Sequence, residues 1–166
     1  IVTNVSFYDL FTPDELYDMW EVDNLRCYIQ RANYAGGNGI IPAAEKRLLT
    51  NILDSADDVI KNGSKVADLR FGHDGNISPL FALMQINDFA VSINDFNEVH
   101  KYWRNYKVVP MATNLQIIFF RNEKNPDDIL VKFLHNESEA RIPVRTETFP
   151  FYKWTDVKRF YRDLLK

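Results

Sequence analysis

The 166-residue sequence predicts an α/β fold, in which helices flank a sheet, and three observations support this prediction. Apolar residues between positions 48 and 60 recur at helical spacing, and Asn62-Gly63 ends that pattern. Residues 66–71 then form a short, apolar, strand-like run. A turn with two glycines, residues 72–76, leads into another helical pattern. This order of helix, strand, turn and helix is typical of an α/β sheet.

The first helix is predicted to begin at Thr12. Thr12 can cap the helix, Pro13 suits its first position, and two acids follow in the first turn. Apolar residues keep helical spacing to Ala32, and the glycine cluster of residues 36–39 breaks the pattern. Because this cluster follows a helix rather than a strand, it is a poor candidate for a phosphate-binding loop.

The next helices are predicted from the residues that begin and end them. Pro42 opens a second helix, and Gly63 ends it. Ser78-Pro79 caps and opens a third helix, whereas residues 95–99 fit either a short helix or irregular chain.

The last third of the chain predicts a sheet and a terminal helix. Residues 114–121 read as a strand with an apolar centre. Residues 128–134 and 139–144 read as a hairpin around residues 136–138, and Thr155 caps a final helix that ends at Leu165. No repeat, low-complexity tract or linker interrupts the sequence, so residues 1–166 are expected to form a single body.

Composition narrows the range of functions. Hydrophobic residues make up 46% of the chain, which supplies a core, and the net charge of −3 disfavours nucleic-acid and membrane-surface partners. No run approaches the roughly 20 apolar residues of a transmembrane helix.

A single cysteine, Cys27, excludes an internal disulfide and is expected to be buried and inert. Three isolated histidines and one cysteine offer no metal-ligand spacing, so we expect neither a metal nor another cofactor.

Residues 70–76 (RFGHDGN) are the candidate functional site. They lie where a predicted strand ends and a helix begins, which is where α/β sheets bind ligands. The positive end of the following helix suits an anion, and His73 beside Asp74 places a cation or donor next to a proton donor. On pattern alone, a simple helix cap is the favoured explanation of the same residues.

Residues 69–76, followed by a Pro-Leu helix, resemble the His-Asp signature of the histidine acid phosphatases. Further segments resemble the inositol-polyphosphate phosphatase branch of that family in the same order: residues 9–12, 34–39, 109–115, 129–136 and 140–143. The resemblance covers almost the whole chain. It implies the C-terminal half of a phosphoglycerate-mutase-like α/β sandwich with flanking helices.

The resemblance also implies roles for individual residues. In this family the histidine of the signature binds the transferring phosphoryl group, and the acid donates a proton to the leaving alcohol. By that correspondence His73 contacts phosphate and Asp74 is the general acid. Asn76 and Arg70 are further candidate substrate contacts because they adjoin the motif, although Asn76 also suits a helix cap and Arg70 also suits an ion pair with an acid elsewhere. Asp74 stands where many animal members carry a glutamate, which leaves the substrate preference open. The resemblance implies a phosphomonoester substrate, with inositol polyphosphates as one option.

The family's nucleophile is a histidine in an Arg-His-Gly-x-Arg-x-Pro motif, which this sequence lacks. The remaining histidines, His100 and His135, are interpreted as surface or hairpin residues. We therefore expect the chain to be the C-terminal part of a phosphatase whose missing N-terminal segment is its partner. Many family members are periplasmic or secreted, and the resemblance implies the same location here.

Two alternatives stay open at this point. One is a non-catalytic domain that binds phosphate esters or a partner through the same turn. The other is an unrelated α/β or helical interaction domain in which His73-Asp74 only caps a helix.

Overall fold

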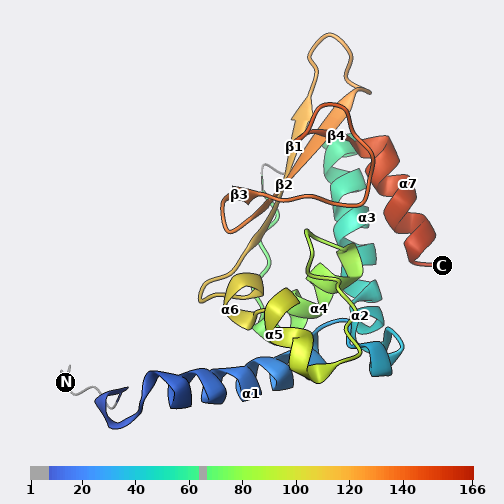
Figure 1. Cartoon of the computed structure of the whole chain (residues 1–166). Helices are drawn as coiled ribbons and strands as arrows, with labels where there is room; N and C mark the ends of the chain where they lie inside the picture. Colours follow the sequence, from blue (N-terminus) through green and yellow to red (C-terminus); the bar gives the residue numbers. More distant parts are fainter. Residues whose placement is uncertain (1–7, 64–66) are drawn as a thin grey trace.

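The computed structural model describes residues 8–63 and 67–166 (Figure 1). The helical base, in the lower half of Figure 1, contains five helices: α1 (Pro13–Arg31), α2 (Ile40–Ala44), α4 (Asp74–Met84), α5 (Val99–Tyr102) and α6 (Asn105–Val108). The sheet end, in the upper half, contains four strands and the last helix: β1 (Leu115–Arg121), β2 (Ile129–His135), β3 (Ser138–Glu139), β4 (Tyr152–Lys153) and α7 (Trp154–Leu164). Helix α3 (Lys46–Asn62) runs from the base to the sheet end.

Helix α1 begins as predicted. The backbone N–H of Glu15 donates to Thr12 Oγ1 at 3.3 Å, and the backbone N–H of Thr12 donates to Glu15 Oε2 at 2.7 Å. This reciprocal capping box satisfies donors that the helix itself leaves free. The hydrogen bonds also lower the pKa of the Glu15 carboxyl below its usual value. A short 3-10 turn, Tyr8–Leu10, precedes the cap.

Helix α3 confirms the predicted end but not the predicted start. Gly63 closes the helix with a φ of 63°, a left-handed conformation that glycine adopts without steric cost. Pro42 lies inside the separate five-residue helix α2, and the chain bends at Glu45 before α3 begins. A 3-10 turn, Ala35–Gly37, occupies the glycine cluster.

The predicted strand at residues 66–71 is wrong over residues 67–71, while Val66 lies outside the described residues. The segment has no strand conformation, and the side chains of Leu69 and Phe71 are 75% and 94% exposed. A strand is stabilised by a neighbouring strand, and no described strand pairs with this segment.

Helix α4 begins at Asp74, five residues earlier than predicted. Ser78 and Pro79 therefore lie inside it, and the Ser78 hydroxyl bonds to the backbone of α1 instead of capping α4. Residues 95–99 form a 3-10 turn, Phe96–Glu98, that continues into α5.

The sheet is antiparallel. Strands β1 and β2 pair along their whole seven-residue lengths, from Leu115 opposite His135 to Arg121 opposite Ile129. The predicted strand at 114–121 and the turn after β2 are confirmed, but the outer arm of that hairpin is a strand for only two residues, β3. Strand β4 pairs with β2 near its start, at Leu130 and Val131, and α7 follows β4 directly. Lys153 rather than Thr155 precedes α7, so the predicted cap is wrong.

One cluster of buried apolar side chains links the helical base to the sheet end. It joins Phe81 of α4 to Phe133 of β2 and Tyr161 of α7, each at most 1% exposed. The Tyr161 hydroxyl donates to the Met84 carbonyl at 3.0 Å, and burial raises its pKa. The base that presents the turn at His73 is thus fixed to the sheet by a continuous core.

Candidate functional site

His73 is the residue that precedes α4. Its carbonyl accepts hydrogen bonds from the backbone N–H groups of Asn76 at 3.0 Å and Ile77 at 3.1 Å. Its side chain is exposed, does not cap the helix, and makes no hydrogen bond or ion pair within residues 8–63 and 67–166. The imidazole therefore stands free at the positive end of an 11-residue helix.

The carboxylate of Asp74 is held by Arg31, the last residue of α1. Arg31 Nη1 donates to Asp74 Oδ2, and the two side chains are 29% and 49% exposed. The Ser78 hydroxyl donates to the Arg31 carbonyl at 3.0 Å, so α4 contacts both the backbone and the guanidinium of this residue. Sequence reasoning missed Arg31, because it lies 43 positions before Asp74 and no local pattern connects the two.

Asn76 points toward the break between α2 and α3. Its side-chain amide donates to Glu45 Oε1 at 3.4 Å, and Glu45 is only 8% exposed. Glu45 is a second neighbour of the site that the sequence did not indicate, since its own position at a helix junction was not predicted.

Arg70 is bound elsewhere. Its guanidinium donates to Asn51 Oδ1 and Ser55 Oγ on α3, and it forms an ion pair with Asp68 at 3.2 Å. The structure therefore brings together His73, Asp74 and Asn76, with Arg31 as the guanidinium at the carboxylate, while Arg70 anchors the extended segment to α3.

The other two histidines differ from each other. His100 is partly exposed, and its Nδ1 lies 2.6 Å from Glu21 Oε1 without hydrogen-bond geometry. His135 ends β2 next to the hairpin turn, so its interpretation as a hairpin residue is confirmed, and at 9% exposure it is a buried residue of that hairpin rather than a surface one.

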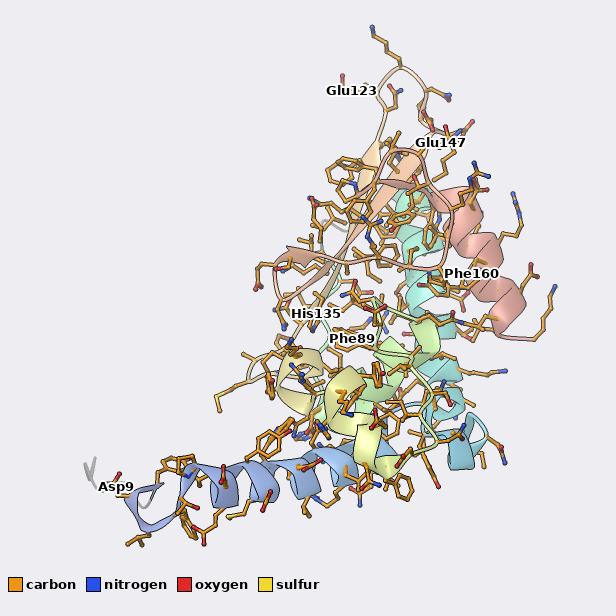
Figure 2. The ribbon with its side chains drawn as sticks, in the orientation of Figure 1. Asp9, Phe89, Glu123, His135, Glu147 and Phe160 are labelled. Atoms are coloured by element: carbon orange, nitrogen blue, oxygen red, sulfur yellow. The ribbon has the colours of Figure 1, made fainter. Side chains whose placement is uncertain are left out.

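The environment of His135 fixes its chemistry. Its ring packs edge-on against Phe81 and Phe89, with centroids 5.1 Å and 5.0 Å away. Figure 2 shows His135 and Phe89 close together between the sheet end and the helical base. Its Nε2 lies 2.9 Å from the Val108 carbonyl, which only accepts, so Nε2 carries the proton. Burial lowers the pKa of His135, which favours the neutral ring, and the ring is packed as a structural group.

Cys27 is buried, as predicted. Within the described part of the chain, no three His, Cys, Asp or Glu side chains gather as a metal site would require. A search of the same residues finds no helix with the length and apolarity to cross a membrane.

Comparison with known proteins decides which family this arrangement belongs to. Residues 2–136 match the histidine phosphatase superfamily, branch 2, which is most of the chain. The chain belongs to this family. The alternative of an unrelated interaction domain is therefore wrong, and the resemblance to histidine acid phosphatases is confirmed.

The relatives of this branch 2 chain are inositol-polyphosphate phosphatases. It is 27% identical to multiple inositol polyphosphate phosphatase 1 of Gallus gallus over 122 residues, covering 69% of the chain and 27% of the relative. The multiple inositol polyphosphate phosphatase of Bifidobacterium longum in complex with phosphate aligns with a TM-score of 0.77 and 21% identity, over 94% of this chain and 34% of that one. Its complex with inositol hexasulfate aligns with a TM-score of 0.68 and 23% identity, over 82% and 29%. These alignments confirm the predicted fold class, and the chain spans about a third or less of the length of these relatives.

Proposed function

We propose that this chain is the part of a histidine phosphatase that supplies a phosphate-contacting histidine, His73, and a proton donor, Asp74. The observation that carries the proposal is the free imidazole of His73 at the start of α4, with a carboxylate on the adjacent residue. Family membership supports the same roles for these two positions.

The proposed roles agree with the chemistry of phosphoryl transfer. The transferring group spreads negative charge over its equatorial oxygens, so a cationic donor and free helix N–H groups stabilise the transition state. The departing alkoxide needs a proton, and general acid catalysis by a carboxylic acid contributes roughly 10²- to 10⁴-fold. His73 and the first turn of α4 serve the first requirement, and Asp74 serves the second. Asn76 extends the same edge as a further polar contact.

The nucleophile comes, in this proposal, from residues outside these 166. The sequence contains no Arg-His-Gly motif, and neither His100 nor buried His135 has arginine-rich surroundings. The purified 166-residue chain should therefore show no phosphatase turnover above background on an activated aryl phosphate. Robust turnover by the chain alone would contradict this division of the site.

The proposed substrates are phosphomonoesters, with inositol polyphosphates as the favoured class because the matched relatives are named for them. We propose a periplasmic or secreted location for the whole protein, on family resemblance alone.

The proton-donor role has a direct test in the longer phosphatase. Asp74→Asn should lower kcat for an alkyl phosphate, which has a poor leaving group, by about 10²-fold or more. It should affect an activated aryl phosphate much less, because that leaving group departs without a proton. Equal losses on the two substrates would assign Asp74 a structural role instead.

A second candidate is a domain that binds phosphate esters without hydrolysing them. The missing nucleophile motif favours it, because the described site can contact an anion but has nothing to attack it with. The two candidates are separated by the sequence that adjoins this chain in its gene: an upstream Arg-His-Gly-x-Arg motif supports the enzyme, and its absence supports the binding domain.

A further inference from the structure

Arg31 lies at the point where the end of α1 meets the start of α4. Its side chain reaches the carboxylate of Asp74, and its carbonyl accepts the hydrogen bond from Ser78. Ser78 is 1% exposed, and this second, partly buried contact fixes the backbone of Arg31 against α4. The guanidinium thus starts from a fixed base, which reduces the entropy that is lost when it binds the carboxylate.

We propose that Arg31 is a positioning residue, which holds the Asp74 carboxylate next to His73 in the orientation for proton donation. This inference rests on the proposed function of Asp74. It adds a residue to the site that the resemblance did not indicate.

The atoms used by the ion pair fit this role. Arg31 Nη1 binds Asp74 Oδ2, while Oδ1 has no partner among the described residues. The proton can therefore reside on Oδ1. In the transfer step the nucleophile of the longer phosphatase forms a bond to phosphorus, while the P–O bond to the leaving group breaks with its electron pair going to the leaving oxygen. The Oδ1–H bond then breaks, the proton bonds to that oxygen, and its electron pair stays on the carboxylate. Arg31 stabilises the negative charge that Asp74 gains.

The exposure of the Arg31–Asp74 ion pair distinguishes a positioning role for Arg31 from a role in stabilising the fold. Both partners are partly in water, and exposed ion pairs contribute little to folding. Arg31→Gln should therefore change the melting temperature by no more than about 3 °C. A readout of side-chain orientation or catalysis is needed to detect the proposed effect.

Helix α1 offers a matched control in Arg26. It pairs with Asp23 on the same helix, at 2.5 Å, with side chains 57% and 48% exposed. Arg26→Gln removes an equivalent charge and ion pair on α1 but leaves Asp74 untouched.

The first experiment measures the χ1 rotamer of Asp74 in the 166-residue chain from side-chain scalar couplings. The wild type and Arg26→Gln should show one dominant rotamer, Arg31→Gln should show rotamer averaging, and Arg31→Lys should restore part of the preference. An unchanged rotamer in Arg31→Gln overturns the inference, whether or not the protein has phosphatase activity.

The second experiment uses the longer phosphatase and compares alkyl with aryl phosphates. Arg31→Gln should lower kcat for the alkyl substrate by roughly 10- to 100-fold, the effect of a misplaced catalytic group, with a smaller loss on the aryl substrate. In an Asp74→Asn background, the same change should add almost nothing.

The two proposals fail in different ways. If Asp74→Asn affects both substrates equally, the proton-donor role fails, although rotamer averaging in Arg31→Gln still supports the positioning contact. If Asp74→Asn shows the leaving-group dependence and Arg31→Gln does not, the inference about Arg31 fails alone.

Discussion

His73 and His135 lie in opposite kinds of environment, and the contrast separates a residue available for binding from one used for structure. His135, at the sheet end, is 9% exposed, contacts two phenylalanine rings and bonds to the Val108 carbonyl. His73, in the turn before α4, is exposed and has no side-chain partner within the described residues. The first histidine is enclosed by aromatic rings and uses its Nε2 inside the fold, whereas both ring nitrogens of the second are open to a ligand.

The same contrast holds for the phenylalanines of the two regions and gives the largest expected effect. Phe133→Ala should lower the free energy of unfolding by about 3–5 kcal/mol, because the side chain is 1% exposed and packs against Tyr152. Phe71→Ala, at a position 94% exposed, should change it by no more than about 0.5 kcal/mol. Urea unfolding followed by circular dichroism measures both. A large loss for Phe71→Ala would show that the turn is packed in solution.

The depressed pKa of His135 predicts a pH dependence of stability. Burial disfavours the charged ring, so the unfolded chain binds a proton more readily than the folded chain. The stabilisation should be complete above the unfolded pKa of about 6.5 and be lost as the pH falls below it, toward the lower folded pKa. The slope of melting temperature against pH between 7 and 5 should flatten in His135→Gln. It should persist in His73→Ala, and an equal slope in all three proteins would refute the assignment.

The N-termini of α1 and α4 provide a comparison in which the expected effect on stability is smaller. Thr12→Ala should cost about 1 kcal/mol, because it removes the side-chain oxygen that accepts from the Glu15 backbone N–H in the capping box. His73→Ala should cost less than about 0.5 kcal/mol, because its side chain caps nothing. Thermal unfolding of the two variants measures the difference. A cost for His73→Ala equal to that of Thr12→Ala would revive the interpretation of His73-Asp74 as a simple cap.

Local chemistry made part of the fold predictable. The cap at Thr12, the left-handed glycine at Gly63 and the strand at 115–121 each depend on nearby residues, and all three are present. Residues 67–71 have the composition of a strand but no described strand to pair with, so composition alone predicted a strand that does not form there. The start of α4 was missed because Ser78, a good cap in isolation, bonds to the carbonyl of Arg31.

Only the residues of the candidate site that lie close together in sequence were predictable. His73, Asp74 and Asn76 are consecutive or nearly so, and a family resemblance points to them. Arg31, at the end of α1, and Glu45, at the junction of α2 and α3, reach the same place. Only the packing of these two points against α4 reveals them. Arg70 lies three residues before His73 in sequence, yet its bonds to α3 occupy its guanidinium.

The most direct test of the phosphate contact is an NMR titration of the 166-residue chain with inorganic phosphate at constant pH and ionic strength. The chain has three histidines, so their ring C–H signals can be assigned by single substitutions. The His73 signals should shift and saturate with a dissociation constant on the order of 1 mM or weaker. The His135 signals should stay in place, as should those of His100, and Asp74→Asn should retain the His73 response. An unmoved His73, or equal shifts at all three histidines, would contradict the assignment of the turn before α4 as a phosphate-contacting half-site.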